Sequence, residues 1–300
     1  MATNGGSEEE ELVKIKELEE RVKDLNTDDD DPGFLTHQTY RRYLVARDWN
    51  IDAAEKMLKA SIIWRHETKP HHVTCTFCDN TPGFHSMRHI GDDKLGRPVL
   101  YANFAQCQTQ HNTAEDSIQH IIYLIENAKR IMPSDVYQYV WVMDFTGMKV
   151  ASCSPRQARG VEQIVSNHYP ERLGCFIGVN HGALFQAFWS TVKHFVPPAT
   201  VKKVHVHRSQ DKIDALFSEL FSEELKQWLY DEIRLNHQHP ISIQQKEFWK
   251  FDKTHDSRGC SSYISKYIDT FNVDNYINNK CVSMYLPHPN IITDIVNAEQ

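Results

Sequence analysis

The sequence predicts an α/β fold in which a mainly parallel sheet is joined by crossover helices. Short apolar runs alternate with helix-length periodic segments from about residue 80 to residue 235. Strands separated by helices of this length pair in parallel. The 300 residues are 40% apolar and 24% charged, a balance that supports one sizeable core with appendages.

The segment before residue 80 predicts helices. Ile15, Leu18, Val22 and Leu25 recur at helical spacing after a polar lead, which predicts a short amphipathic helix. The acids, proline and glycine of residues 28–33 end it. Two further helices are expected at residues 36–47 and 51–66, the second capped by Asn50. The apolar spacing predicts its inner face to be Ala54, Met57, Leu58, Ser61, Ile62 and Trp64.

The remaining elements follow in alternation. Strands are expected at residues 97–101, 136–145, 173–179 and 201–206. Helices are expected at residues 114–132, 155–168, 183–196, 211–220 and 223–235. Residues 236–300 are aromatic but show no clear period, and no element is predicted there.

A run from Leu173 to Val192 contains no Asp, Glu, Lys or Arg. Its glycines and polar residues argue against a membrane span, which needs about 20 predominantly apolar residues. The first half is typical of a buried strand, and the second half of a helix that is apolar on nearly every side. A helix with little polar face is either buried or covers something apolar. The helical half of the run is therefore an internal core helix or a lid over a lipid-sized cavity.

Composition and charge argue against several classes of protein. A net charge of −7 argues against a general nucleic-acid binder, whose footprint would be basic, but it allows local docking on an anionic membrane. The polar, acidic first 11 residues lack a signal-peptide apolar region. Seven scattered cysteines form no disulfide framework, which predicts a reduced, cytosolic protein.

Enzyme motifs are absent from the sequence. It contains no Gly-x-x-x-x-Gly-Lys phosphate loop, no Gly-x-Ser-x-Gly elbow and no His-Glu-x-x-His pair. Asp144, at the end of a predicted strand, is expected to cap the next segment. Cys153 and Cys175 are expected to be packing residues. The sequence therefore predicts a protein that is not an enzyme and carries no cofactor.

One group of metal-ligand residues lies between the helical segment and the first predicted strand. Cys75, Cys78, His85 and His89 form Cys-x₂-Cys and His-x₃-His pairs, spacings that suit tetrahedral zinc. The gap of 6 residues between the pairs is shorter than the usual 12 or so. With 17 histidines in the chain, chance neighbours are expected. The four residues are a zinc candidate, and no metal is assigned.

Four segments, in order and at compatible spacing, carry a family resemblance. They are Tyr43-Leu44-Val45-Ala46-Arg47 with Ala54 and Trp64-Arg65; Asp93 to Val99; Asp144-Phe145-Thr146-Gly147; and His168 to Gly174 continued by Phe195 to Val204. Over about residues 12–235 the chain resembles the CRAL-TRIO lipid-binding family, in particular the yeast-type phosphatidylinositol transfer proteins. The resemblance implies an N-terminal helical bundle and an α/β domain. The sheet of that domain would floor a hydrophobic lipid pocket closed by a gating helix.

The resemblance also implies a division of the chain. An acidic lead with a short helix occupies residues 1–30, the N-terminal helical region residues 31–80 and the lipid-binding domain residues 81–235. Residues 236–300 form an extension with no expected structure.

Headgroup residues follow from the same resemblance. In relatives that bind phosphatidylinositol, the matching positions hold the headgroup; here they are Arg47, Glu171, Thr200 and Lys203. Arg and Lys suit a phosphodiester, a Thr hydroxyl adds a donor, and a carboxylate accepts from inositol hydroxyls. An ordinary alternative is that Glu171 pairs with a nearby Arg and Lys203 faces water. The presence of all four residues favours the headgroup site.

The gate and pocket are expected elsewhere on the chain. The gating helix would present Leu184, Phe185, Phe188, Trp189, Val192 and Phe195 to the acyl chains. Tyr139 and Trp141 stand where relatives that also bind phosphatidylcholine have small hydroxyl residues. A phosphocholine site of that design is therefore not expected. Core packing is favoured for both aromatics over shaping a second ligand or a cation–π contact.

These observations together predict a cytosolic protein, peripheral on membranes and monomeric. It would extract one lipid, most consistently phosphatidylinositol, and carry it between membranes or present it to lipid-modifying enzymes. One alternative is a carrier of a tocopherol or retinoid, which would not need Arg47, Glu171 and Lys203 around a phosphate. Another is a protein-interaction or GTPase-regulating module.

Overall fold

The computed structural model describes residues 7–25, 31, 33–73, 75–77, 85–107 and 113–248. Within them the elements run α1 (Glu8–Val22), α2 (His37–Val45), α3 (Ile51–Thr68), η1 (Pro70–His72), β1 (Met87–Asp92), β2 (Pro98–Asn103), α5 (Ala114–Ile131), β3 (Tyr139–Asp144), η3 (Val150–Ser152), α6 (Pro155–His168), β4 (Leu173–Val179), α7 (Ala183–Val192), α8 (Pro198–Val201), β5 (Val204–Val206), α9 (Gln210–Leu220), α10 (Glu223–Asn236) and α11 (Ile243–Phe248). The chain forms two compact units. The first is Met1–Val73 with Val161–Arg172, and the second is Thr74–Gly160 with Leu173–Gln300.

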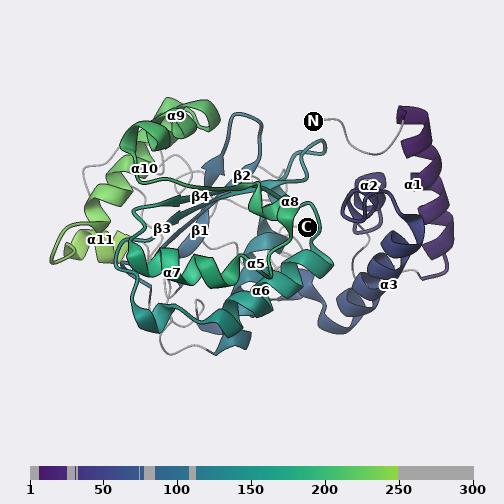
Figure 1. Cartoon of the computed structure of the whole chain (residues 1–300), viewed down its shortest axis with the longest axis horizontal. Helices are drawn as coiled ribbons and strands as arrows, with labels where there is room; N and C mark the ends of the chain where they lie inside the picture. Colours follow the sequence, from purple (N-terminus) through teal and green to yellow (C-terminus); the bar gives the residue numbers. More distant parts are fainter. Residues whose placement is uncertain are drawn as a thin grey trace, which may run out of the picture. The chain divides into compact units, whose positions relative to one another are not determined.

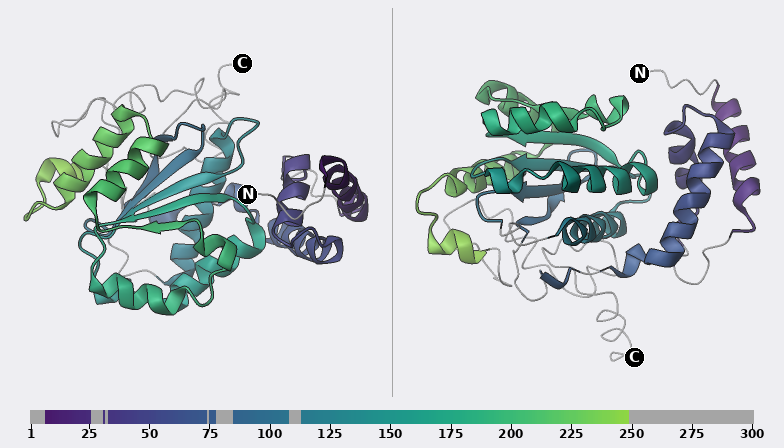
Figure 2. Two further views of the ribbon diagram at one scale, coloured as in Figure 1. Left: turned by 45° about the horizontal axis from the view of Figure 1, so that its top comes forward. Right: turned by 60° about the horizontal axis from the view of Figure 1, so that its bottom comes forward.

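The first unit is built on the three predicted N-terminal helices. Helix α1 begins with a capping box between Ser7 and Glu10, which satisfies amide donors of the first turn. Thr36 caps α2 and Asn50 caps α3, each by accepting a hydrogen bond from a backbone amide. The three helices pack side by side, as the right view of Figure 2 shows. Their shared core is Ile15, Leu18, Val22, Phe34, Tyr40, Tyr43, Leu44, Trp49, Ala54, Met57, Leu58 and Ile62.

The inner face of α3 differs from the prediction at one residue. Trp64 is only half-buried. Its ring stacks on His168, with the ring centroids 4.2 Å apart. The next residue, Arg65, is buried instead. Its guanidinium pairs with Asp31 and lies 4.5 Å from the centroid of the Phe34 ring. An arginine can be buried here because its charge is paired.

Hydrogen bonds attach residues 167–170 to α2 and α3 within the first unit. The buried Arg42 donates to the carbonyl of Pro170 at 2.9 Å. The Tyr43 hydroxyl donates to the carbonyl of His168 at 3.2 Å, and the Ser61 hydroxyl to that of Asn167 at 2.9 Å. The segment that precedes Glu171 is therefore held by helices more than 100 residues earlier in the chain.

The second unit contains the predicted sheet, in the order β1-β2-β3-β4-β5. Strand β1 is antiparallel to β2, and the other neighbours are parallel. The mainly parallel sheet is therefore confirmed. Strand β1 was not predicted because its sequence, Met-Arg-His-Ile-Gly-Asp, lacks a β-branched run and gains its order from pairing. Strand β5 starts at Val204 and not at Val201, because Pro198 opens the helical turn α8.

One face of the sheet is covered along its central strands. Strand register places Val99, Val140, Val142 and Ile177 on this face, and each is at most 1% exposed. Helices α9 and α10 cover it, as Figure 1 shows. They contribute Ile213, Phe217, Phe221, Leu225, Trp228 and Leu229 to the core.

The opposite face of the sheet meets α5 and α7 (Figure 1). Figure 2 shows from a second direction that α7 lies on the side of the sheet away from α9 and α10. Register places Leu100, Trp141 and Phe176 on this face. Different helices therefore cover the two faces. Only the face opposite α9 and α10 is covered by α7, the helix from the uncharged run.

Candidate functional site

An aromatic series fixes the start of α7 to the sheet. The buried Phe185 lies with its ring centroid 4.1 Å from that of Phe145, and Phe145 stacks on Phe104 at 5.6 Å. Trp189 continues the series, parallel to Phe185 at 6.3 Å. Gly178 makes this possible, since a Cβ there would lie 2.9 Å from the Phe145 ring.

Helix α7 is shorter and more two-sided than expected. It ends at Val192, so Phe195 lies in the following turn. Phe185 and Val192 are buried, whereas Leu184, Phe188, Trp189 and Phe195 are half-buried. Its exposed side carries polar groups, namely Gln186, Ser190 and Thr191. The expectation of a helix apolar on nearly every side was therefore wrong, and the helix is an amphipathic cover.

The sheet face that α7 covers is incompletely filled. Met143, Phe176, Val204 and Val206 share this face by register, and all four are half-buried. On the opposite face Val142 and Ile177 of the central strands are buried, whereas His205 of the edge strand β5, which pairs with Ile177, is half-buried. Apolar side chains that stay partly accessible on both the helix and the sheet form a surface able to take up apolar ligand atoms.

Tyr139 and Trp141, the predicted pocket-wall residues, project from β3 with ring centroids 6.3 Å apart. They are 1% and 8% exposed. Trp141 lies on the face that α7 covers, and its burial agrees with a packing role there.

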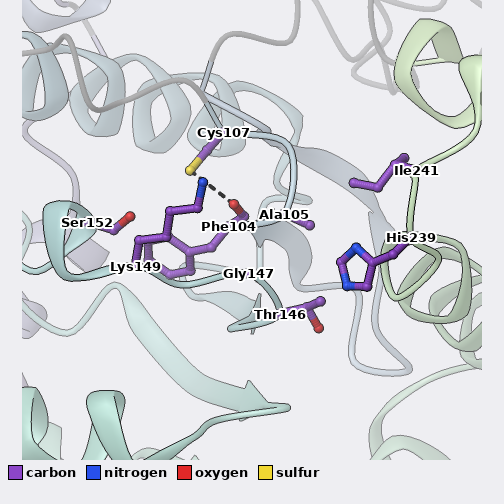
Figure 3. Close-up of a pocket in the computed structure, with 9 residues that line it drawn as sticks. All are labelled: Phe104, Ala105, Cys107, Thr146, Gly147, Lys149, Ser152, His239 and Ile241. Atoms are coloured by element: carbon purple, nitrogen blue, oxygen red, sulfur yellow. Dashed lines mark hydrogen bonds between the residues drawn. The ribbon is translucent and has the colours of Figure 1, made fainter.

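A cavity of about 220 Å³ lies where β2 and β3 end, and Figure 3 shows its lining. The lining residues are Phe104, Ala105, Cys107, Thr146, Gly147, Lys149, Ser152, His239 and Ile241. A second cavity, of about 300 Å³, lies in the first unit between the end of α1 and α3. Neither contains a predicted headgroup or gate residue. Both are at or below the roughly 300–1,000 Å³ of sites that enclose drug-sized ligands.

Thr200 and Lys203 lie together in the second unit. The amide of Lys203 donates to the carbonyl of Thr200 at 2.9 Å, so a single turn carries both side chains. The amide of Phe176 in turn donates to the carbonyl of Lys203 at 2.9 Å, which ties the turn to β4. Both residues are half-buried.

Arg47 and Glu171 lie in the first unit. Arg47 follows α2 directly before Asp48 and Trp49, whose φ angles of 50° and 61° turn the chain sharply. Its guanidinium donates to the carbonyl of Ala46 at 2.8 Å. Glu171 has a φ of 57°, directly after the carbonyl that Arg42 holds. Both side chains are half-buried and stand at tight turns.

The structure does not bring the zinc-candidate residues together in the combination that the sequence spacing indicated. Cys75 and His85 lie together, with Sγ and Nδ1 3.5 Å apart, and Cys78 lies outside the described residues. The Nε2 atom of His89 lies 3.5 Å from a carboxylate oxygen of Asp92. A third neighbour of Cys75 and His85 is His120 on α5. Sequence spacing could not identify it, since 34 residues separate it from His85.

Two protein-family models match the chain. Residues 14–60 match the family model described as CRAL/TRIO, N-terminal domain, and residues 87–228 match the CRAL/TRIO domain. Together the matches cover more than half of the chain. The chain belongs to the CRAL/TRIO family.

Individual CRAL/TRIO relatives are distant. The chain is 28% identical over 195 residues to the CRAL-TRIO domain-containing protein C3H8.02 of Schizosaccharomyces pombe, covering 62% of this chain and 42% of that protein. It is 25% identical over 264 residues to phosphatidylinositol transfer protein PDR17 of Saccharomyces cerevisiae, covering 78% of this chain and 71% of that protein. The chain thus spans less than half the length of the first relative.

A solved CRAL/TRIO-like structure shares the fold. The crystal structure of Sfh5 aligns with a TM-score of 0.52 at 17% sequence identity, covering 65% of this chain and 79% of that one. The CRAL/TRIO matches run from α1 into α3 and from β1 into α10. Helix α11 and the cavity residues His239 and Ile241 follow them. Among the described residues, no helix is long and apolar enough to cross a bilayer.

Proposed function

We propose that the chain is a non-enzymatic lipid-binding and transfer protein that carries one phosphatidylinositol molecule. It would work in the cytosol, contact membranes transiently, and deliver its lipid to another membrane or to a lipid-modifying enzyme. The observation that carries the proposal is the contrast between the two sheet faces. The face under α7 keeps Met143, Phe176, Val204 and Val206 half-buried, whereas the residues of the central strands under α9 and α10 are closed off from solvent.

Acyl-chain burial supplies the affinity in this proposal. Each buried CH₂ group contributes about 0.8 kcal/mol. Neither of the two cavities has room for two acyl chains, and in this proposal α7 moves away from the sheet to admit them. The half-buried Leu184, Phe188 and Trp189 would then touch the bilayer or the lipid.

Headgroup selection would rest on Arg47, Glu171, Thr200 and Lys203. Two cations and a hydroxyl suit the phosphodiester, and the carboxylate suits the inositol hydroxyls. The names of relatives support this ligand: PDR17 is called a phosphatidylinositol transfer protein, and a plant relative with 26% identity is called a phosphatidylinositol/phosphatidylcholine transfer protein.

The test is transfer of labelled lipid between vesicles by the full chain. The double variant Arg47→Ala with Lys203→Ala should lower phosphatidylinositol transfer at least tenfold, because two charge-assisted hydrogen bonds contribute about 1.5–3 kcal/mol each. Lys202→Ala is the matched control, since Lys202 is the exposed neighbour of Lys203. Its transfer rate should equal that of the wild type.

Lipids that co-purify with the chain distinguish the alternatives. Phosphatidylinositol at about one molecule per chain supports the proposal. A tocopherol or retinoid in its place, or wild-type transfer by the double variant, rejects the headgroup assignment. A chain that takes up no amphiphile at all rejects lipid carriage.

A further inference from the structure

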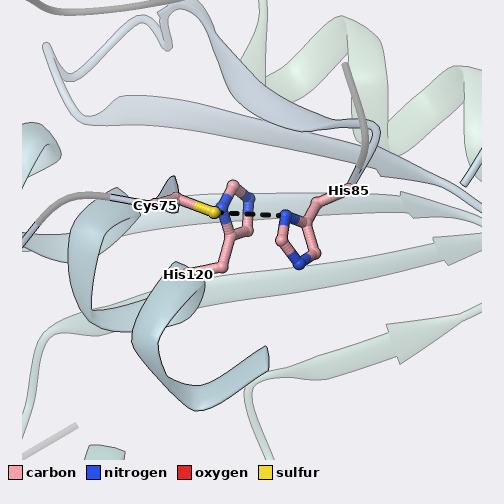
Figure 4. A group of neighbouring side chains, drawn as sticks. All are labelled: Cys75, His85 and His120. Carbon is pink, nitrogen blue, oxygen red and sulfur yellow. Dashed lines mark hydrogen bonds between the residues drawn. The ribbon is translucent and has the colours of Figure 1, made fainter. Parts of the chain in front are cut away.

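Three metal-ligand side chains meet in the second unit. Cys75 precedes β1, His85 stands just before it, and His120 lies on α5. Their ligand atoms all fall within 4.8 Å of one another, and Figure 4 shows the three side chains converging. They are 2%, 1% and 2% exposed, so the cluster belongs to the interior.

The spacing suits tetrahedral coordination. With bonds of about 2.3 Å to sulfur and about 2.0–2.1 Å to nitrogen, neighbouring ligands of a tetrahedral zinc lie about 3.5 Å apart. The Sγ atom of Cys75 lies at that separation, 3.5 Å, from Nδ1 of His85. The rings of His85 and His120 stack with centroids 3.9 Å apart and planes 17° from parallel. One nitrogen of each ring already lies within 4.8 Å of the sulfur.

The surroundings favour a cation that is partly neutralised by its ligands. Phe77 and Tyr123 pack beside Cys75, and they also lie next to His85 and His120, respectively, at centroid distances of 6.1 and 6.0 Å. A thiolate with two neutral imidazoles reduces the charge of a divalent cation to one, which lowers the cost of holding it in an apolar shell. Sulfur with imidazole nitrogen selects zinc-type ions over magnesium or calcium.

We propose that Cys75, His85 and His120 bind one zinc ion that ties the segment before β1 to α5. The ion would join residues 45 positions apart in the sequence, and a water molecule would complete the tetrahedron, since three protein ligands leave the fourth position open. This ligand set differs from the one that sequence spacing indicated, because His120 takes the place of His89. The competing explanation is a metal-free cluster in which the thiol donates to His85.

Metal content is measured first on the full chain purified in zinc-supplemented medium. The proposal expects close to one zinc per chain. Replacing zinc with cobalt(II) should produce a thiolate-to-cobalt charge-transfer band, which reports the sulfur ligand directly. Removal of zinc with a chelator should lower the melting temperature, and added zinc should restore it, because a ligand that binds only the folded state stabilises it.

Matched variants identify the ligands. Cys75→Ser and His120→Asn should each lose the bound zinc, and Cys75→Ser should also lose the charge-transfer band. Cys107→Ser and His66→Asn are the controls and should keep both, since Cys107 is only half-buried and His66 is exposed. His89→Asn should also keep the metal.

Wild-type protein settles the question even if a ligand variant does not fold. Zinc far below one equivalent, together with a melting temperature unchanged by chelator and by added zinc, overturns the proposal in favour of the hydrogen-bonded cluster. Zinc retained at full stoichiometry by folded Cys75→Ser and His120→Asn also overturns it, since the ion would then be held elsewhere.

Discussion

Asp144 organises the turn at the end of β3. The side chain is fully buried, and Oδ1 accepts hydrogen bonds from the amide and hydroxyl of Thr146 and from the side-chain amide of Asn180. Burial raises its pKa, and the hydrogen bonds oppose that shift. Gly147 follows with a φ of 77°, where a Cβ would lie 3.0 Å from the backbone of Ala105. The Asp-Phe-Thr-Gly motif is therefore a structural turn. Asp144 caps this turn and not the next helix, since Lys149 is the N-cap residue of η3.

His168 makes stability depend on pH. Burial, with a smaller effect of Arg65, lowers its pKa from 6.5 to about 4. Between these values the unfolded chain binds the proton and the folded chain does not, so stability rises with pH and is lost as pH falls from 6.5 toward 4. His168→Phe keeps a ring against Trp64 but cannot be protonated. We expect a smaller decrease of its melting temperature over this pH range, measured by circular dichroism.

The exposed His66 provides the control for this prediction. His66→Phe should leave the pH dependence of the melting temperature as in the wild type. A His168→Phe variant whose melting temperature still falls as steeply as that of the wild type would show that another group is responsible.

The first turn of α7 is anchored to the sheet, whereas its later residues are partly accessible to solvent. Phe185 anchors it through Phe145, and Trp189, one turn later, is half-buried. Trp189→Glu should slow lipid exchange from vesicles more than tenfold. Burying a large apolar side chain contributes about 1.5–3 kcal/mol, and 1.4 kcal/mol corresponds to a factor of ten.

The same helix supplies the control. Gln186 is exposed, so Gln186→Glu adds the same charge without removing apolar contact, and its exchange rate should stay near that of the wild type. Equal exchange rates for the wild type and a folded Trp189→Glu variant would contradict a membrane-contacting role for α7.

At the scale of the whole molecule, we expect one sheet face to serve stability and the other to serve ligand uptake. Trp228 of α10 is 0% exposed, and Trp228→Ala should lower the free energy of unfolding by about 3–5 kcal/mol. Phe176 lies half-buried on the other face. Phe176→Ala should cost less stability, because less of the ring is removed from a closed core.

Lipid binding should respond in the opposite order. Phe176→Ala is expected to weaken lipid loading, measured by mass spectrometry of bound lipid. Folded Trp228→Ala should load normally. A larger loss of stability in Phe176→Ala than in Trp228→Ala would mean that the α7 face is the better packed one.

Local patterns predicted most of the elements. The cap of α3 and the bounds of α6 and β4 follow from residues next to them in the chain. Strand β1 was missed because its order depends on pairing with β2. The burial of Gln245 could not be predicted either, since its amide donates to Glu232 and Asn236 on the preceding helix. The four headgroup residues were selected from the sequence by their motif positions and side-chain chemistry. Their role in binding a headgroup remains a prediction.

The sequence by itself determined the α/β class, the family and the uncharged run that becomes β4 and α7. Periodicity, capping and motif spacing act between residues close together in the chain, so they can be recognised without coordinates. Only the tertiary structure decided that Arg65 is buried, that the α7 face of the sheet stays partly accessible, and that His120 joins Cys75 and His85. These features depend on contacts between distant segments, because packing and not local propensity selects which side chains meet.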